Sequence, residues 1–154
     1  MADKKISVLY VDDEENNLFS FKAVFRVKYQ VYTAISGDEA LKILGEKPIE
    51  IIITDQRMPN MTGVEFLEKV IEKFPDPMRL LLTGYADMNA VVDAVNKGKI
   101  FHYLSKPWNE EELDITINRA HEAYLQKEKL KEENKLLGTS NDQLEFLLRQ
   151  KLLS

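Results

Sequence analysis

The chain has 154 residues, a formal net charge of -5 and a pI of about 5.2. This acidic balance argues against direct nucleic-acid binding, which depends on lysine and arginine neutralising phosphates. The absence of cysteine excludes disulfides, thiolate nucleophiles and zinc-finger sites. The sequence shows neither the apolar run of a signal peptide nor the ~20 apolar residues that span a bilayer. We therefore expect a soluble, cytoplasmic protein without a membrane partner.

Five short apolar runs divide the chain, at residues 6–11, 31–35, 49–54, 78–83 and 100–104. Between them, apolar residues recur at helical spacing, as in the first such segment with Leu18, Phe21, Val24 and Phe25. The near-continuous apolar runs around residues 51–53 and 80–82 are typical of strands buried on both faces. This alternation predicts an α/β fold, namely a (βα)5 doubly wound, flavodoxin-like sheet of five parallel strands in the order 2-1-3-4-5.

Capping residues mark several of the expected helix starts. Three pairs place a capping side chain three residues before an acid: Ser36 and Glu39, Thr62 and Glu65, and Asn109 and Glu112. In such a pair the first side chain accepts a hydrogen bond from a free backbone N–H, and the acid interacts favourably with the helix dipole. These pairs predict where the second, third and fifth helices begin.

The C-terminal part differs from the rest of the chain. After Asn109 a helical pattern continues to about residue 137, which is ~28 residues or roughly 40 Å of extended C-terminal helix. We expect residues 127–135, which are rich in charge, to form a solvated helix face. Ser140 with Gln143 is expected to cap a last short helix. Its shared apolar face comprises Leu144, Leu147, Leu148 and Leu152.

That leucine face has two possible uses, and the sequence does not decide between them. It can bind a partner, or it can dock on the chain's own domain. Leu130, Leu137 and Leu144 are seven residues apart, which gives the extension a coiled-coil-like character that Gly138 interrupts. A homodimer through the fifth helix and its extension is therefore a further expectation.

Acidic, hydroxyl and basic side chains stand where the predicted strands end. Asp12 and Asp13 follow the first strand, Asp55 the third, Thr83 the fourth and Lys106 the fifth. In an open parallel sheet these strand ends share one crevice. Clustered carboxylates that repel one another suit Mg²⁺. A carboxylate there can attack a phosphoryl donor, while a lysine and a hydroxyl stabilise the phosphoryl oxygens.

These residues resemble the motifs of response-regulator receiver domains of two-component systems. The matching motifs are Asp12-Asp13, Asp55 followed after two intervening residues by Met58-Pro59, Gly63, Thr83, Tyr103, and Lys106-Pro107. The resemblance covers roughly residues 5–125. The runs at residues 55–59 and 83–87 are similar to receivers of hydrogenase-regulator type, and to receivers that precede cyclic-nucleotide phosphodiesterase domains.

The resemblance implies a role for each site residue. Asp55 would accept the phosphoryl group from a sensor histidine kinase or a phosphotransfer protein. Asp13, Asp55 and the backbone carbonyl of Arg57 would ligate Mg²⁺ directly, and Asp12 would act through water. Thr83 and Lys106 would bind the phosphoryl oxygens as catalytic groups.

The resemblance also implies how the signal spreads. Thr83 and Tyr103 would act as switch residues, coupling phosphorylation to the surface of the fourth helix, fifth strand and fifth helix. Arg57 and Tyr85 would flank the phosphoryl group and modulate its lifetime. The chain would then be a switch and not an enzyme, with a receiver domain at residues 1–125 and a helical extension at 126–154. The downstream output domain or partner is not visible in the sequence.

Each site residue also has an ordinary structural interpretation. Asp12 and Asp13 can cap the first helix, and Tyr103 can be a half-buried strand tyrosine. A different function is an oligomerising scaffold that depends little on phosphorylation. A phosphatase of the haloacid-dehalogenase kind needs a second carboxylate two residues after the nucleophile, where this chain has Arg57. A flavodoxin-like cofactor site needs a phosphate-binding loop after the first strand, where this chain is acidic.

Overall fold

The computed structural model describes residues 4–133 and 141–153. The strands are β1 (Ser7–Val11), β2 (Gln30–Ala34), β3 (Ile51–Asp55), β4 (Met78–Thr83) and β5 (His102–Ser105). The helices are α1 (Glu15–Phe25), α2 (Gly37–Glu46), α3 (Gly63–Lys73), the short 3-10 helix η1 (Tyr85–Asp87), α4 (Met88–Asn96), α5 (Glu110–Glu133) and α6 (Asn141–Leu153).

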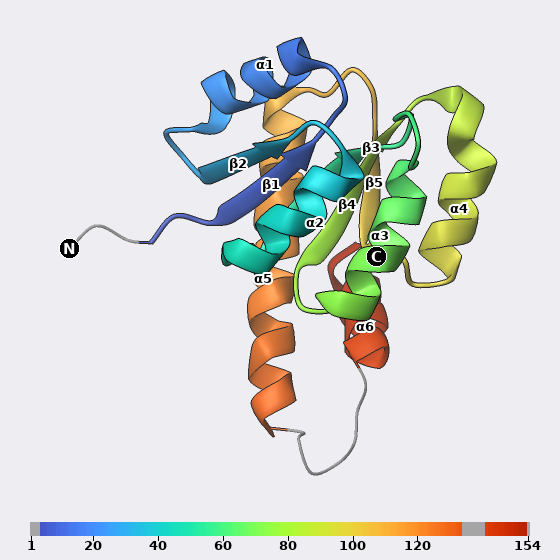
Figure 1. Cartoon of the computed structure of the whole chain (residues 1–154). Helices are drawn as coiled ribbons and strands as arrows, with labels where there is room; N and C mark the ends of the chain where they lie inside the picture. The colour runs from blue at the N-terminus through green and yellow to red at the C-terminus, as the bar shows by residue number, and fades with distance from the viewer. Residues whose placement is uncertain (1–3, 134–140, 154) are drawn as a thin grey trace.

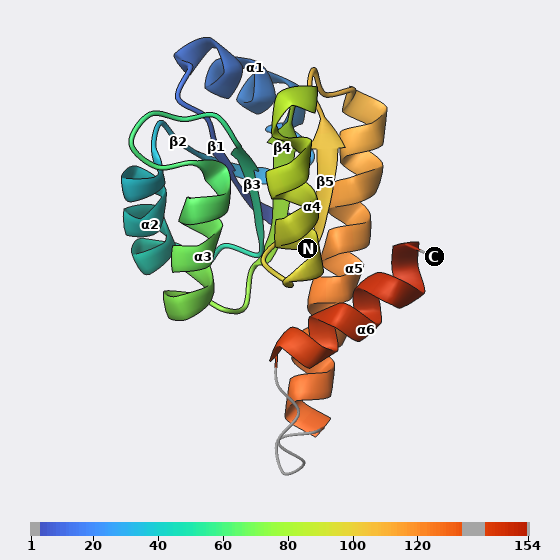
Figure 2. The ribbon, with the colours of Figure 1, turned by 90° about the vertical axis from the view of Figure 1, so that its right-hand side faces the viewer.

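The strands form one parallel sheet in the order β2-β1-β3-β4-β5, which confirms the predicted doubly wound topology. Helices α1 and α5 cover one face, and α2, α3 and α4 cover the other (Figures 1 and 2). Because both faces are covered, the central strands are buried throughout.

Alternate side chains of each central strand enter two separate cores. In β3, Ile51 and Ile53 pack with α1 and α5, whereas Ile52 packs with α2, α3 and α4. Successive side chains of a strand point to opposite faces of the sheet, so a continuous apolar run serves both cores. This packing fixes the positions of the strand ends, where the candidate site lies.

The predicted helix starts at Ser36, Thr62 and Asn109 are confirmed. The side chains of Ser36 and Asn109 accept backbone hydrogen bonds three residues on, at 3.1 and 2.9 Å. Thr62 and Glu65 form a reciprocal capping box. The expected cap at Ser140 lies outside the described residues.

The apolar face of α1 differs in part from the prediction. Phe21 and Phe25 are fully buried, and Leu18 packs against the same core. Val24, expected on this face, is 37% exposed. The rings of Phe21 and Phe25 contact each other and Trp108 in tilted and edge-on arrangements, and the core contact of the helix is centred on them.

Helix α6 folds back beside α5 and docks on the chain's own domain (Figures 1 and 2). Its Leu144 and Leu148 are 4% and 5% exposed, so the docking alternative for this face is the one observed. Leu147 is 61% exposed and lies outside the contact. The proposed heptad position at Leu137 and the side chain of Leu152 lie outside the described residues.

The expectation of a solvated face at residues 127–135 is wrong at Lys127. This lysine is fully buried, because α6 covers it and supplies a carboxylate partner.

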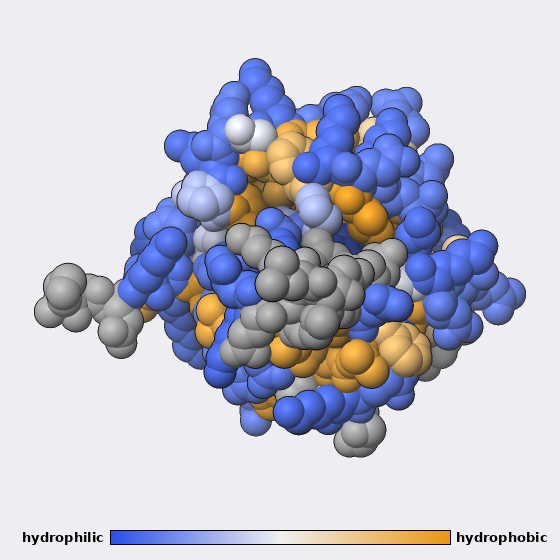
Figure 3. All heavy atoms as spheres, turned by 90° about the horizontal axis from the view of Figure 1, so that it is seen from below, coloured by the Kyte–Doolittle hydropathy of each residue, from blue (hydrophilic) through white to orange (hydrophobic). Residues whose placement is uncertain are grey.

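Figure 3 views this end of the molecule from below and shows apolar patches among mainly hydrophilic residues. Among the described residues, no helix combines the length and apolar character that crossing a membrane requires.

Candidate functional site

Three carboxylates gather at the carboxyl end of the sheet. Asp12 and Asp13 follow β1, and Asp55 is the last residue of β3. One ligand oxygen from each lies within 4.8 Å of the others, so the three can contact a single ion. Oxygen donors of this kind are the ligands that Mg²⁺ prefers. The donor set therefore fits the Mg²⁺ site that the sequence predicts.

Asp55 is buried and paired with Lys106. Its side chain is 5% exposed, and Lys106 Nζ lies 2.7 Å from Asp55 Oδ1. Burial raises the pKa of Asp55, and the bond from Lys106 offsets part of that rise. Burial alone would lower the pKa of Lys106, but its bond to Asp55 raises it. The site thus holds a carboxylate and an ammonium group in direct contact.

Asp12 is held in place by donors on both of its oxygens. The backbone N–H of Glu14 donates to Oδ1 at 3.0 Å. Asn17 Nδ2 and the Tyr10 hydroxyl donate to Oδ2 at 3.0 and 3.4 Å. Burial raises the pKa of Tyr10, which keeps this hydroxyl protonated and able to donate. Glu14 is the N-cap of α1, so the bond from its N–H lies before the first helical residue and does not make Asp12 a helix cap.

We expect Asn17→Ala to weaken Mg²⁺ binding by about ten-fold, since groups that orient metal ligands typically contribute that much or more. The amide of Asn17 fixes the Oδ2 side of Asp12. Mg²⁺ titration followed by Trp108 fluorescence measures the effect. Asn16→Ala is the matched control, because Asn16 is exposed. Equal affinities in the two variants would contradict the orienting role.

The expected switch residues lie on β4 and β5, the two strands that follow β3 in the order of the sheet. Thr83 ends β4, is 1% exposed and donates from Oγ1 to the backbone oxygen of Gly84 at 3.2 Å. Tyr103 in β5 is half-buried and packs at the edge of the core under α4. Thr83 therefore stands at the same sheet end as Asp55, with its hydroxyl bonded to the backbone.

Arg57, two residues after Asp55, reaches the start of α4. Its Nε donates to Asp87 Oδ2 at 3.0 Å, and its side chain is 70% exposed. Tyr85 begins η1 on the neighbouring β4–α4 connection, and its side chain lies outside what the structure describes. The guanidinium of Arg57 is thus paired across the mouth of the site with the segment that leads into α4.

Several contributors to the site were not predicted as such from the sequence. Gln56 is 7% exposed, and its side chain accepts a hydrogen bond from Val64 N at 2.9 Å, which ties the loop after β3 to α3. Trp108 lies with Asp12 and Lys106 along a hollow of about 410 Å³. Asn17 stands in the first turn of α1, and its amide reaches back to Asp12. The available sequence signal for its role was a polar amide in the first turn of the helix that follows the acidic pair.

The comparisons with known proteins agree with this geometry. The family model of the response regulator receiver domain matches residues 8–118. The hydrogenase transcriptional regulatory protein HoxA of Cupriavidus necator is 39% identical over 123 residues, which cover 80% of this chain and 26% of that protein. The chain therefore spans about a quarter of the length of this curated relative.

Solved structures show the same likeness. A structure described as adenylate cyclase from Rhodopirellula baltica is 31% identical with a TM-score of 0.78, covering 88% of this chain and 99% of that one. A response regulator receiver domain protein from Clostridium thermocellum is 32% identical with a TM-score of 0.72, covering 76% and 94%. Residues 8–118, which the family model matches, include the strands, apart from Ser7, and the acidic cluster of Asp12, Asp13 and Asp55. The chain belongs to the response regulator receiver domain family.

Proposed function

We propose that this chain is a phosphorylation-operated switch in which Asp55 accepts a phosphoryl group from a sensor histidine kinase or a phosphotransfer protein. The observation that carries the proposal is the direct contact of the buried Asp55 with Lys106, beside Asp12 and Asp13. The Asp55 carboxylate can attack the phosphorus of a phosphohistidine and form an acyl phosphate, while the P–N bond of the donor breaks and its imidazole leaves. Such a chain responds to its own phosphorylation and does not turn over a substrate, so we propose no enzyme activity.

Mg²⁺ would be held directly by Asp13, Asp55 and the backbone carbonyl of Arg57, and by Asp12 through water. The ion supplies positive charge that offsets the charge of the phosphoryl oxygens. Lys106 would exchange its bond to Asp55 for a bond to the phosphoryl group. Thr83 would turn its hydroxyl from Gly84 to the same group, since both residues stand at this end of the sheet.

The turn of Thr83 would couple the site to the surface formed by α4, β5 and α5. Tyr103 lies on β5 beside β4 and would move inward into the space that Thr83 leaves. The coupling is a shift between two populations of one fold.

Incubation with Mg²⁺ and acetyl phosphate, followed by intact-mass measurement, tests the proposed function. We expect a Mg²⁺-dependent gain of one phosphoryl group in the wild-type chain and none in Asp55→Ala. Trp108 fluorescence should change at the same time, since Trp108 lies with Lys106 and Asp12 along one hollow. A folded wild-type protein that gains no mass would contradict the proposal.

Arg57 and Tyr85 are proposed to set the lifetime of the phosphorylated state. We expect Arg57→Ala to change the dephosphorylation rate, because its guanidinium is tied across the site to Asp87. Asp87→Ala should change the rate in the same direction, since it breaks the same pair. Tyr85→Ala tests the second position. Mass measurements after removal of acetyl phosphate give the rates, and wild-type rates in all three variants would dispose of this role.

The alternative function, an oligomerising scaffold, is supported by exposed apolar side chains on α5 and α6. The Leu144 and Leu148 face is covered within the chain, so a homodimer through α5 and its extension would use other residues. Leu125 on α5 and Phe146 and Leu147 on α6 are more than half exposed. Sedimentation with and without beryllium fluoride, a phosphoryl mimic, separates a scaffold from a switch: a dimer that ignores the mimic supports the scaffold.

The division of the chain and its cellular place also stay proposals. We propose a receiver unit at residues 1–125 and a helical extension at 126–154, in the cytoplasm with the kinase. The docking of α6 means that the extension shares a core with the receiver unit.

A further inference from the structure

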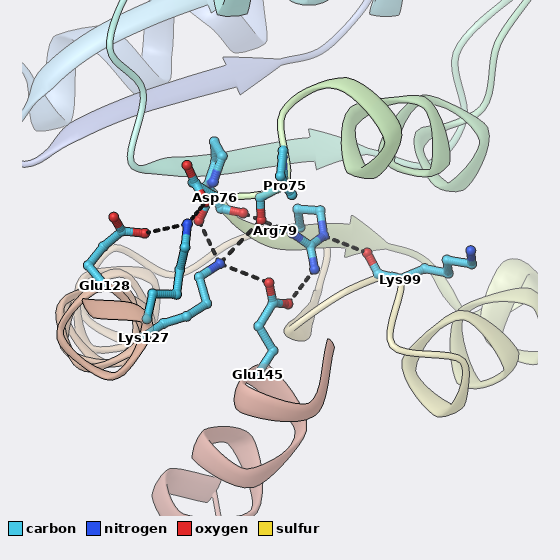
Figure 4. A network of polar contacts seen from close by, with 9 residues as sticks. Pro75, Asp76, Arg79, Lys99, Lys127, Glu128 and Glu145 are labelled. Carbon is cyan, nitrogen blue, oxygen red and sulfur yellow. Dashed lines mark hydrogen bonds and ion pairs between the residues drawn. The ribbon is translucent and has the colours of Figure 1, made fainter. Parts of the chain in front are cut away.

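A buried cluster of three charged side chains joins α6 to the rest of the fold (Figure 4). Glu145 of α6 points between Arg79 of β4 and Lys127 of α5, and pairs with both. Lys127 Nζ lies 2.9 Å from Glu145 Oε2. The side chains of Arg79, Lys127 and Glu145 are 1%, 0% and 9% exposed. Three elements distant in the sequence thus meet at one carboxylate.

The remaining donors of both cations bond to backbone oxygens. Lys127 Nζ donates to the oxygens of Asp76 at 2.7 Å and Pro75 at 3.3 Å. Arg79 Nε donates to the oxygen of Lys99, in the α4–β5 connection, at 2.9 Å. Among the residues that the structure describes, Glu145 is the one carboxylate that pairs with both cations. If α6 left, two buried cations would lose their shared counter-charge.

Apolar packing surrounds this cluster. Leu148 belongs to the core formed by α1, α5 and the sheet, together with Phe101 and Ala123. Burial of such apolar side chains stabilises the docked helix but does not select one orientation of it. The ion pairs of the charged cluster do, because they form only when Glu145 faces both cations. The combination holds α6 in a single position against the amino-terminal ends of β4 and β5 and the side of α5 (Figure 2).

From this position α6 also contacts the element proposed to move in the switch. Arg149 Nη1 donates to the backbone oxygen of Val95 in the last turn of α4 at 2.8 Å, and to that of Ile100 at 3.5 Å. Arg149 and Tyr103 line the same surface hollow beside β5. Helix α6 therefore bonds to both ends of the α4–β5 connection.

We propose that α6 is a regulatory clasp, which holds the α4–β5 connection in one arrangement and loosens when Asp55 is phosphorylated. This arrangement, in which Lys106 is bonded to Asp55 and Thr83 to Gly84, is called the resting arrangement. The proposal rests on the proposed function of Asp55. A shift of α4 and β5 would break the bonds of Arg149, so docked α6 favours the resting arrangement. By linkage, phosphorylation must weaken α6 docking to the same degree.

Hydrogen exchange of the full-length chain, followed by mass spectrometry, tests this coupling. We expect beryllium fluoride with Mg²⁺ to speed amide exchange in α6, and the effect to be absent in Asp55→Asn. Arg149→Ala should bind beryllium fluoride at least about five-fold more tightly than wild type, because the variant lacks the hydrogen bonds that stabilise the resting arrangement. Arg26→Ala, a change of an exposed arginine after α1, should bind as wild type does.

Glu145→Gln provides an independent variant, since it replaces the negative carboxylate with a neutral amide of similar size. It should speed α6 exchange before any beryllium fluoride is added. Unchanged α6 exchange and unchanged affinity in Arg149→Ala, in a protein that gains a phosphoryl group, would overturn the clasp alone. A folded protein that neither gains a phosphoryl group nor responds to beryllium fluoride would overturn the proposed function and the coupling with it.

Discussion

Gly63→Ala is expected to lower the free energy of unfolding by about 3 kcal/mol, at the upper end of the usual cost of overpacking. A Cβ at this position would lie 2.4 Å from the backbone oxygen of Asp55 and 2.8 Å from Leu81 Cδ1. The backbone oxygen belongs to a central strand and cannot move without displacing the site. Urea unfolding measures the loss, and phosphorylation by acetyl phosphate should slow in the same variant.

Gly84→Ala is the matched control for this change. A Cβ at Gly84 would meet no atom within 4 Å, so we expect the stability to change by less than about 0.5 kcal/mol. Comparing the two variants separates the cost of a Cβ against the backbone of β3 from the general effect of replacing a glycine on the free energy of unfolding. Similar losses in the two variants would contradict the account of Gly63.

Glu145→Ala is expected to lower the free energy of unfolding by about 3 to 5 kcal/mol, the usual cost of breaking a buried ion pair by removing one partner. The change leaves Arg79 and Lys127 buried without their shared carboxylate. Burial lowers the pKa of Lys127, and its interaction with Glu145 opposes that effect, so loss of the carboxylate favours the neutral lysine or its exposure. Guanidinium unfolding measures the loss, and Glu122→Ala on the exposed side of α5 is the control.

A triple variant shows whether desolvation causes that loss. Replacing Arg79, Lys127 and Glu145 together with methionine removes all three charges and keeps comparable volume. We expect it to recover most of the stability lost in Glu145→Ala, because apolar replacement of a complete buried charge cluster is often neutral or stabilising. A triple variant less stable than Glu145→Ala would show that the polar contacts themselves stabilise the fold.

The sheet and most of the site are predictable from the sequence because they follow from local patterns. Apolar runs locate each strand to within about two residues, and the carboxyl-end rule brings Asp12, Asp55, Thr83 and Lys106 to one edge. Helix starts are equally local, since a cap such as Thr62 depends on a residue three positions away. Patterns of this kind need no knowledge of distant contacts.

The features that were not predicted depend on distant segments. Lys127 on α5 is buried because Glu145, eighteen residues later, and Arg79, on β4, meet it in space. Its burial cannot be read from the charged sequence around it. Arg79 was the available signal, since a charge inside the otherwise apolar run of β4 requires a buried partner. The same reasoning applies to Asn17, whose target becomes clear only when α1 is placed against β1.

Mapping the phosphoryl group to a residue tests whether Asp55 is the phosphoryl acceptor. Borohydride reduces an acyl phosphate to an alcohol, so a phosphorylated aspartate in acetyl-phosphate-treated protein is marked permanently. Tandem mass spectrometry of the peptides then locates the mark. We expect it at residue 55 alone, only with Mg²⁺, and reduced in Lys106→Met, which removes the ammonium group 2.7 Å from Asp55. A mark at Asp12, at Asp13 or at no aspartate would contradict the assignment of Asp55 as the phosphoryl acceptor.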